Sequence, residues 1–238
     1  MMYEIRSYIG TRKVQEDAYG GCMTDNGMFV VVCDGIGGSA HGKESSQFTA
    51  ERLTELFRTE YTGNFPHFIL KAAESADTEI NEKYGGRCGT TAVAVHICSG
   101  ELNWFSVGDS RLYIMRNGRL KQITTDHNYG YVLELRKQKG LIDEDTFRRE
   151  MNRAEHLASY IGMGGMDIVD LSLKPFLLEK GDKLLVTTDG LYKSLTEDII
   201  YDIIYSENDI FSAADALRNA VMKCTAPTDN TTFALIYT

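Results

Sequence analysis

Short apolar stretches recur along the 238-residue chain and predict a fold rich in β-sheet. Residues 28–33, with the sequence MFVVVC, are apolar throughout, which is typical of a strand buried on both faces. Asn117 and Gly118 separate two further apolar segments and form a strong signal for a tight hairpin turn. The pattern predicts strands at 3–9, 28–33, 90–97, 101–107, 111–115, 120–124, 168–173, 183–188 and 230–237.

Helical periodicity occurs in blocks on either side of the hairpins. Residues 44–57 place apolar side chains on roughly one helical face, and a second helix is expected to begin near Pro66. Thr196 and Ser212 are the expected N-terminal caps of two later helices. Helices that cluster apart from antiparallel hairpins favour an α+β fold in which the helices cover the sheets.

The composition indicates one domain that spans residues 1–238. No linker, repeat or low-complexity segment divides the chain, and it is long enough to bury a substantial core. The charged segment 132–153 is expected to be helical, with a break near Gly140.

The formal net charge of −9 argues against nucleic acid or an acidic membrane surface as the main partner. The five cysteines are odd in number and contain no CxxC pair, which suits a reducing compartment. The first ten residues have no apolar core of signal-peptide length, and the run 28–33 is far too short to span a bilayer. We therefore expect a cytoplasmic protein, and nothing in the sequence points beyond a monomer.

Acidic residues lie where several predicted strands meet glycine, serine or asparagine turns. Two carboxylates ~4 Å apart repel by roughly 4 kcal/mol at an effective dielectric constant of about 20. If these turns meet in the fold, the carboxylates need a cation, or some of them must bind protons. Ligands that are all oxygen favour Mg²⁺ or Mn²⁺ over zinc. The acidic residues concerned are Asp34, Asp109, Asp189 and Asp229, with Glu16 and Asp17 near the N-terminus.

Each motif is weak when it is taken alone. Asp109 is also compatible with a hairpin turn paired to Arg111, and Arg12 with an ordinary surface arginine. Asp34 is more informative, because it ends a wholly apolar strand, where a turn alone would not require a carboxylate. Gly35 has no side chain, so its backbone carbonyl can approach a ligand closely. The joint presence of these motifs therefore favours a shared metal site.

The order of the motifs resembles the metal-dependent protein serine/threonine phosphatases of type 2C. The length, and the charged segment between His127 and Gly162, resemble the bacterial branch of that family, with a flap-like segment within about 128–165. The matching stretches are Arg12-x-x-Gln-Glu-Asp-Ala18, Asp34-Gly-Ile-Gly-Gly38, Gly89-Thr-Thr91, Val107-Gly-Asp-Ser-Arg111, Thr125-Asp-His127, Thr188-Asp-Gly190 and Asp229-Asn230.

This resemblance implies a four-layer α/β/β/α sandwich, with two antiparallel sheets flanked by helices. It also implies a site for two Mn²⁺ or Mg²⁺ ions, with a third, weaker ion in bacterial members. By this resemblance, Asp34 bridges the two metals and Gly35 supplies its backbone carbonyl as a ligand. Asp189 and Asp229 bind the first metal, Glu16 and Asp17 the second, and Asp109 the third, while Arg12 binds the phosphate group.

The implied function is hydrolysis of phosphoserine and phosphothreonine in proteins by a metal-activated water, which would oppose a serine/threonine kinase. Two alternatives stay open: a non-catalytic pseudophosphatase that binds a phosphoprotein or kinase, and a phosphoesterase for small molecules. Ile36 stands where some relatives carry a histidine proposed as general acid, so another group must protonate the leaving oxygen, and His41 is one candidate. Cys33 and Cys88 are expected to be packing residues.

Overall fold

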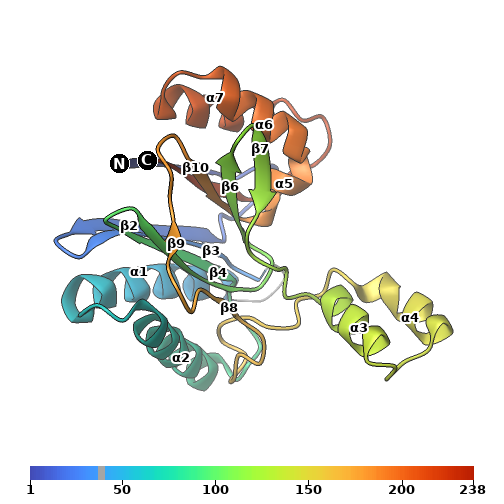
Figure 1. Cartoon of the computed structure of the whole chain (residues 1–238). Helices are drawn as coiled ribbons and strands as arrows, with labels where there is room; N and C mark the ends of the chain where they lie inside the picture. Colours follow the sequence, from blue (N-terminus) through green and yellow to red (C-terminus); the bar gives the residue numbers. More distant parts are fainter. Residues whose placement is uncertain (37–40) are drawn as a thin grey trace.

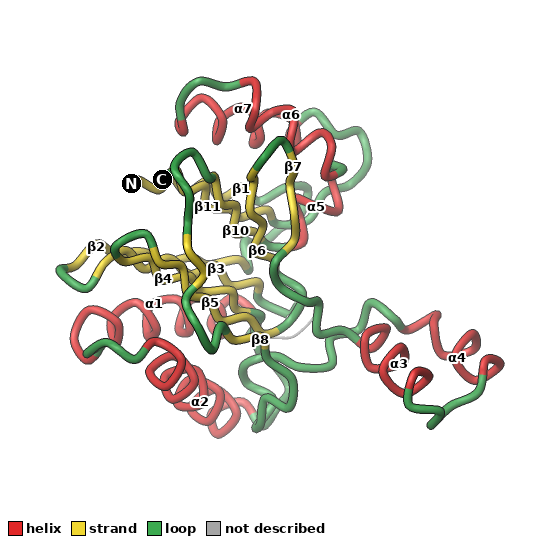
Figure 2. The backbone as a smooth tube through the Cα atoms, in the orientation of Figure 1, coloured by secondary structure: helices red, strands yellow, loops and turns green. Residues whose placement is uncertain are grey.

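The computed structural model describes residues 1–36 and 41–238, which form two antiparallel sheets packed face to face between two groups of helices (Figures 1 and 2). The expected α+β fold with four layers is confirmed. Gly37 and Gly38, from the glycine-rich turn, lie outside the described residues.

One sheet contains both ends of the chain. Its strands pair antiparallel in the order β1-β11-β10-β6-β7, so the first and last strands of the chain are neighbours. The bounds are β1 (Met2–Tyr8), β11 (Thr231–Tyr237), β10 (Lys183–Thr187), β6 (Arg111–Arg116) and β7 (Arg119–Gln122).

The other sheet pairs antiparallel in the order β2-β3-β4-β5-β8, and a short strand, β9, also pairs with β5. Only a two-residue core of the predicted strand 168–173 forms, as β8. The bounds are β2 (Asp17–Thr24), β3 (Gly27–Asp34), β4 (Ala92–Cys98), β5 (Glu101–Val107), β8 (Asp170–Leu171) and β9 (Phe176–Leu177).

The outer layers are helical, as Figure 1 shows. The helices α1 (Gly42–Glu60) and α2 (Phe65–Tyr84) cover the sheet that contains β3. The opposite face of the molecule is formed by α5 (Asp189–Ser194), α6 (Glu197–Ser206) and α7 (Ile210–Met222), which pack against the sheet that contains β11.

The continuous apolar character of β3 follows from its place between two cores. Successive side chains of a strand point to opposite faces, and both faces of β3 are covered. Burial of one such side chain stabilises the fold by about 1.5–3 kcal/mol. Met28, Val30 and Val32 face the other sheet, whereas Phe29, Val31 and Cys33 face the helices α1 and α2. β3 is therefore held from both sides, and its end at Asp34 is rigidly placed.

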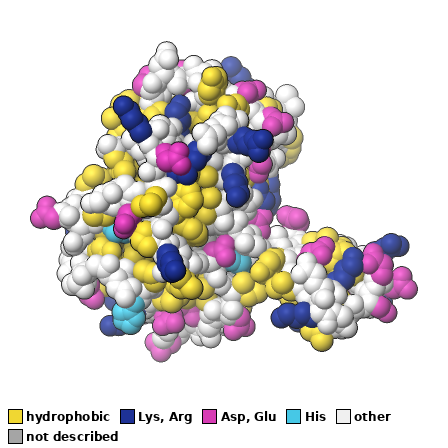
Figure 3. Space-filling view, viewed as in Figure 1, with side chains coloured by type: hydrophobic (Ala, Val, Ile, Leu, Met, Phe, Trp, Pro, Cys, Tyr) yellow, Lys and Arg dark blue, Asp and Glu magenta, His cyan; other side chains and the backbone are white. Residues whose placement is uncertain are grey.

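The charged segment forms an extension that projects from the sandwich (Figure 1). It contains α3 (Tyr129–Gln138), α4 (Glu144–Glu150) and a short 3-10 turn (Met151–Arg153). The expected break is present, because Gly140 adopts the left-handed conformation with φ 68°. Side chains of both charge signs cover the face of the extension seen in Figure 3.

The strand β2 is a feature that the sequence pattern does not predict. Its sequence, DAYGGCMT, contains two adjacent glycines, which are unfavourable in strands. A Cβ atom at Gly20 would lie 2.9 Å from the carbonyl oxygen of Ala50 and 2.1 Å from Oγ1 of Thr54, both in α1. Gly20 therefore permits close approach of α1 to the sheet, which local propensity does not reveal.

One helix start also differs from expectation. α7 begins at Ile210 rather than Ser212, because the Asp209 side chain accepts hydrogen bonds from the backbone N–H groups of Phe211 and Ser212, each at 2.9 Å. The expected cap at Thr196 is confirmed. In the described part of the chain, no helix combines the length and the apolar character needed to cross a membrane.

Candidate active site

A cavity of about 220 Å³ lies where the ends of β3, β10 and β11 meet the turn between β5 and β6. Every predicted site residue except Asp17 lines it. Asp17 lies next to it, because the strand register pairs Asp17 of β2 directly with Asp34 of β3. The tertiary structure thus brings all the predicted acidic residues into one region.

Asp34 is fixed at the centre of this region through its backbone. Its N–H donates to Oγ1 of Thr91 at 3.0 Å, and its carbonyl oxygen accepts from the N–H of Thr91 at 2.9 Å and from Oγ1 of Thr90 at 2.8 Å. Burial raises the pKa of its carboxyl group well above the usual range, and Asp17 and Asp189 raise it further. The Asp34 carboxylate is therefore costly unless it receives a proton or a cation.

Asp17 is buried beside Asp34 and has one oxygen engaged. Oγ1 of Thr188 donates to its Oδ2 at 3.0 Å, whereas Oδ1 has no hydrogen-bond partner among the described residues. Burial is the main cause that raises the pKa of Asp17 to about 7. The hydrogen bonds to its side chain lower this pKa, whereas the nearby charges of Asp189 and Asp229 raise it. Asp17 therefore has one buried oxygen that is available to a proton or a cation.

Asp109 lies in the turn between β5 and β6, and its backbone is tied to α5. The hydroxyl group of Tyr192 donates to the carbonyl oxygen of Asp109 at 2.9 Å. Burial raises the pKa of the Asp109 carboxyl group to about 6, Asp189 raises it further, and Lys193 acts in the opposite direction.

Asp189 begins α5 immediately after β10, and Asp229 lies before β11. Oδ2 of Asp189 accepts from Nζ of Lys193 at 2.7 Å, and Oδ1 of Asp189 is buried without a hydrogen-bond partner in the described structure. Asp229 forms an ion pair with Nη2 of Arg12 at 2.5 Å. Both carboxylates that the resemblance assigns to a first metal are thus engaged by basic side chains.

Glu16 and Gly35 complete the predicted set. Burial raises the pKa of Glu16, Arg12 lowers it and Asp229 raises it. The N–H of Gly35 donates to the carbonyl oxygen of Glu16 at 3.1 Å, and a Cβ atom at Gly35 would lie 2.4 Å from the carbonyl oxygen of Gly42. A side chain at position 35 would therefore push the Glu16 loop away from α1.

These residues fit a hard divalent cation in donor chemistry. The donors are carboxylate oxygens, Asp17 and Asp109 are buried, and two buried oxygens, on Asp17 and Asp189, lack partners among the described residues. However, no group of three or more His, Cys, Asp or Glu side chains outside positions 37–40 surrounds a common point closely enough to hold an ion. Arg12 and Lys193 already contact Asp229 and Asp189, so an ion there must displace them or reorient the carboxylates.

Two residues of the cavity have no predicted role but connect its parts. Asn230 accepts from the N–H of Glu16 at 2.8 Å and donates to the carbonyl oxygens of Ile9 and Val14 at 2.8 and 3.0 Å. It therefore holds the loop of Arg12 and Glu16 against the start of β11. Lys193 is the second such residue. If a helix had been predicted to begin at Asp189, the spacing of one helical turn between Asp189 and Lys193 would have indicated their contact.

The remaining candidates lie elsewhere. The His41 ring stacks on Tyr84, with ring centroids 4.4 Å apart, and is absent from the described lining of the acidic cavity. Cys33 and Cys88 are buried, as expected of packing residues, and burial raises the pKa of the Cys33 thiol, so it is a poor nucleophile.

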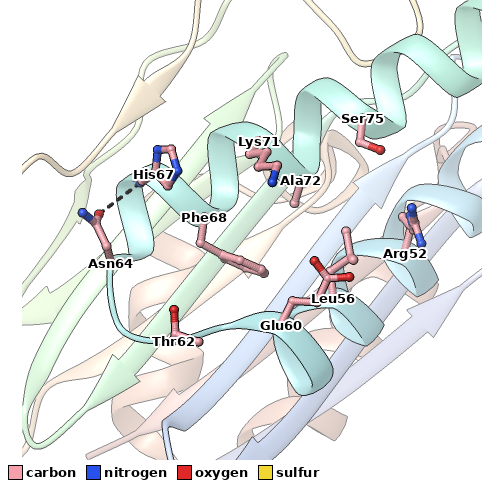
Figure 4. Close-up of a pocket in the computed structure, with 10 residues that line it drawn as sticks. All are labelled: Arg52, Leu56, Glu60, Thr62, Asn64, His67, Phe68, Lys71, Ala72 and Ser75. Atoms are coloured by element: carbon pink, nitrogen blue, oxygen red, sulfur yellow. Dashed lines mark hydrogen bonds between the residues drawn. The ribbon is translucent and has the colours of Figure 1, made fainter.

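A second hollow, of about 330 Å³, lies between α1 and α2 (Figure 4). Its polar groups include Arg52, His67 and Lys71, and the carboxylate in its described lining is that of Glu60. Oδ1 of Asn64 at its edge accepts from the N–H of His67, which caps α2 (Figure 4). This hollow lacks the convergent carboxylates of the acidic cavity.

Comparison with known proteins agrees with the motifs and the geometry. Residues 6–223 match the family described as protein phosphatase 2C. The chain belongs to this family. As a member of the family it is a protein serine/threonine phosphatase, and metal dependence is general in the family.

The relatives are bacterial, which confirms the resemblance to the bacterial branch. A putative protein phosphatase of Mycoplasma genitalium is 25% identical over 240 residues, which cover 94% of this chain and 90% of that protein. The serine/threonine phosphatase stp of Listeria welshimeri is 29% identical over 201 residues, covering 80% and 77% of the two chains. The structure of the S. agalactiae serine/threonine phosphatase superposes with a TM-score of 0.82 at 26% identity and covers 99% of each chain.

Proposed function

We propose that this phosphatase hydrolyses phosphoserine and phosphothreonine in proteins with the help of two divalent cations, Mn²⁺ or Mg²⁺. The observation that carries the proposal is the gathering of carboxylates from five distant segments around one cavity, next to Arg12. When bound, the cations would supply a deprotonated water near neutral pH and neutralise charge on the phosphoryl group. Asp189 and Asp229 would hold one cation and Glu16 and Asp17 the other, while Asp34 would contribute to both and Gly35 would offer its backbone carbonyl.

The carboxyl groups of Asp17 and Asp34 must release their protons to act as ligands. Because burial and neighbouring carboxylates raise the pKa of both groups, metal affinity should increase as the pH rises through about 7, the pKa of Asp17.

Arg12 is proposed to bind the phosphate group. Its guanidinium group pairs with Asp229, and when that carboxylate turns to a cation, the guanidinium is free to donate to two phosphate oxygens. This exchange would place the positive charge of Arg12 beside the substrate only when the site is loaded.

The substrate class follows from the family and from the shape of the molecule. Glu155 and Leu157, which follow the extension formed by α3 and α4 in the chain, line the cavity. We propose that residues 128–165 act as a flap of a single catalytic domain and contact a phosphoprotein, so that the enzyme opposes a serine/threonine kinase in the cytoplasm.

Phosphate release from a phosphothreonine peptide, with and without Mn²⁺ and chelator, tests the proposal. Asp189→Asn should lower the rate at least 100-fold, whereas Asp202→Asn, an exposed control on α6, should not change it. Folded wild-type protein that releases no phosphate at any Mn²⁺ concentration would refute the catalytic proposal and favour a binding role. A mononucleotide cleaved faster than the peptide would favour a small-molecule phosphoesterase.

A further inference from the structure

Lys193 is surrounded by carboxylates at the outer edge of the acidic cavity. Its Nζ lies 2.7 Å from Oδ2 of Asp189, 3.9 Å from Oδ2 of Asp109 and 4.0 Å from Oε2 of Glu155. These acidic residues come from α5, from the turn between β5 and β6, and from the segment that follows α4. The ammonium group thus has the kind of surroundings that a bound cation would have.

The contact is built into the local structure. Asp189 and Lys193 are separated by one turn of α5, the spacing at which helical side chains of opposite charge meet. Such pairs are common on protein surfaces, but here the partner carboxylates are nearly buried, with side chains of Asp189 and Asp109 only 13% and 10% exposed. The charged end of Lys193 therefore contacts these carboxylates at the rim of the cavity, while its side chain stays 45% exposed.

The position of Asp109 is also fixed independently of Lys193. Its carbonyl oxygen accepts from Tyr192, whose ring packs against the guanidinium group of Arg111 at 3.6 Å from the ring centroid. Arg111 in turn donates to Asp126, from Nε to both carboxylate oxygens and from Nη2 to Oδ2. The edge between Asp109 and Asp189 is thus rigid, and Lys193 occupies it.

Electrostatics supports a charged Lys193. Burial lowers the pKa of its ammonium group, but Asp189 and Asp109 more than offset this, so the net pKa is raised. Lys193 in turn opposes the rise of the Asp109 pKa.

We propose that Lys193 is a built-in cation that fills the edge between Asp109 and Asp189 and limits the cavity to two divalent cations. The inference rests on the proposed metal site. It predicts that Asp109 does not hold an ion in the wild-type protein, in contrast to the role implied by the sequence resemblance. Removal of the ammonium group should open this edge to an additional ion.

Counting bound Mn²⁺ tests the inference. The full-length protein is stripped with chelator and titrated with Mn²⁺ in a calorimeter, and the bound metal is then measured by atomic emission after dialysis. Wild-type protein should bind two ions and Lys193→Met three, while Lys193→Arg and the exposed control Lys223→Met should bind two. Asp109→Asn in the wild-type background should still bind two, and Asp109→Asn together with Lys193→Met should return the count from three to two.

Several results would overturn the inference. These are three ions in the wild type, loss of an ion in Asp109→Asn alone, or the same count and dissociation constant in Lys193→Met as in the wild type. The Asp109→Asn result decides the matter even if Lys193→Met does not fold. Wild-type protein that binds Mn²⁺ but releases no phosphate would remove the proposed catalysis and leave this inference standing, whereas no Mn²⁺ binding at all would overturn both.

Discussion

Asp17→Asn is expected to stabilise the metal-free protein at alkaline pH. In the folded protein Asp17 has a pKa of about 7, compared with 3.8 for an ordinary aspartate, and burial is the main cause. The folded state therefore binds more protons than the unfolded state between these two values. Stability must fall as the pH rises through this window, because the unfolded chain releases the proton earlier. Asparagine carries no charge and avoids the loss.

The size of the effect follows from the two pKa values. A difference of about three in pKa, at 1.36 kcal/mol for each, corresponds to about 4 kcal/mol at pH 8 and to almost nothing at pH 4. The amide oxygen of asparagine can still accept the hydrogen bond from Thr188, but its NH₂ group adds a donor, which costs about 1 kcal/mol. We therefore expect a gain of about 3 kcal/mol in the free energy of unfolding at pH 8.

Urea unfolding in chelator at pH 4, 6 and 8 measures this gain. Trp104, the single tryptophan of the chain, lies half-buried on β5 and provides a fluorescence signal. Asp202→Asn should show no dependence on pH relative to wild type. Saturating Mn²⁺, at about 100 times its dissociation constant, should stabilise wild-type protein by roughly 2.7 kcal/mol and the Asp17→Asn variant less. An Asp17→Asn protein that is destabilised equally at pH 4 and pH 8 would refute the reasoning.

Two further variants test the cavity. Arg12→Lys should reduce kcat/KM for a phosphopeptide about 10- to 100-fold, because lysine cannot donate to two phosphate oxygens from one planar group; an unchanged value would contradict phosphate binding by Arg12. Asn230→Ala should lower the free energy of unfolding by about 2–4 kcal/mol, since it leaves two backbone carbonyls and the Glu16 N–H without their partner. Asn230→Asp loses both donor contacts but retains an acceptor for the N–H of Glu16, so a loss equal to that of Asn230→Ala would argue against the contact with Glu16.

Much of the fold can be predicted from the chain because hydrophobic periodicity is a local property. The continuous apolar run 28–33 predicts β3. It also predicts that both faces of this strand are buried, because successive side chains of a strand point to opposite faces. Strand β2 escapes prediction because Gly20 is required by contact with α1, not by strand propensity. α5 escapes it because the Asp189–Gly190 pair is typical of a turn, although here it begins a short helix.

The acidic residues of the candidate site are also evident in the sequence, but their functional roles stay predictions. Their positions at the ends of apolar strands signal a shared region, and the structure brings them there. Lys193 carries no comparable signal, and Asn230 stands out in the sequence as part of the matched pair Asp229-Asn230, without any indication of its partners. A lysine after a turn and an asparagine before a strand are ordinary surface residues until their partners are known.

By itself, the sequence determined most of the order of strands and helices, though not β2 or α5, and the residue types available for chemistry, because both depend on neighbours a few positions apart. Tertiary structure alone decided which carboxylates share a cavity and which basic groups neutralise them. The pairing of Asp17 with Asp34 depends on strand register, and the contact of Asn230 with the carbonyl oxygen of Val14 joins positions 216 residues apart. Charges interact strongly only over a few ångströms, so their balance depends on packing that no local pattern records.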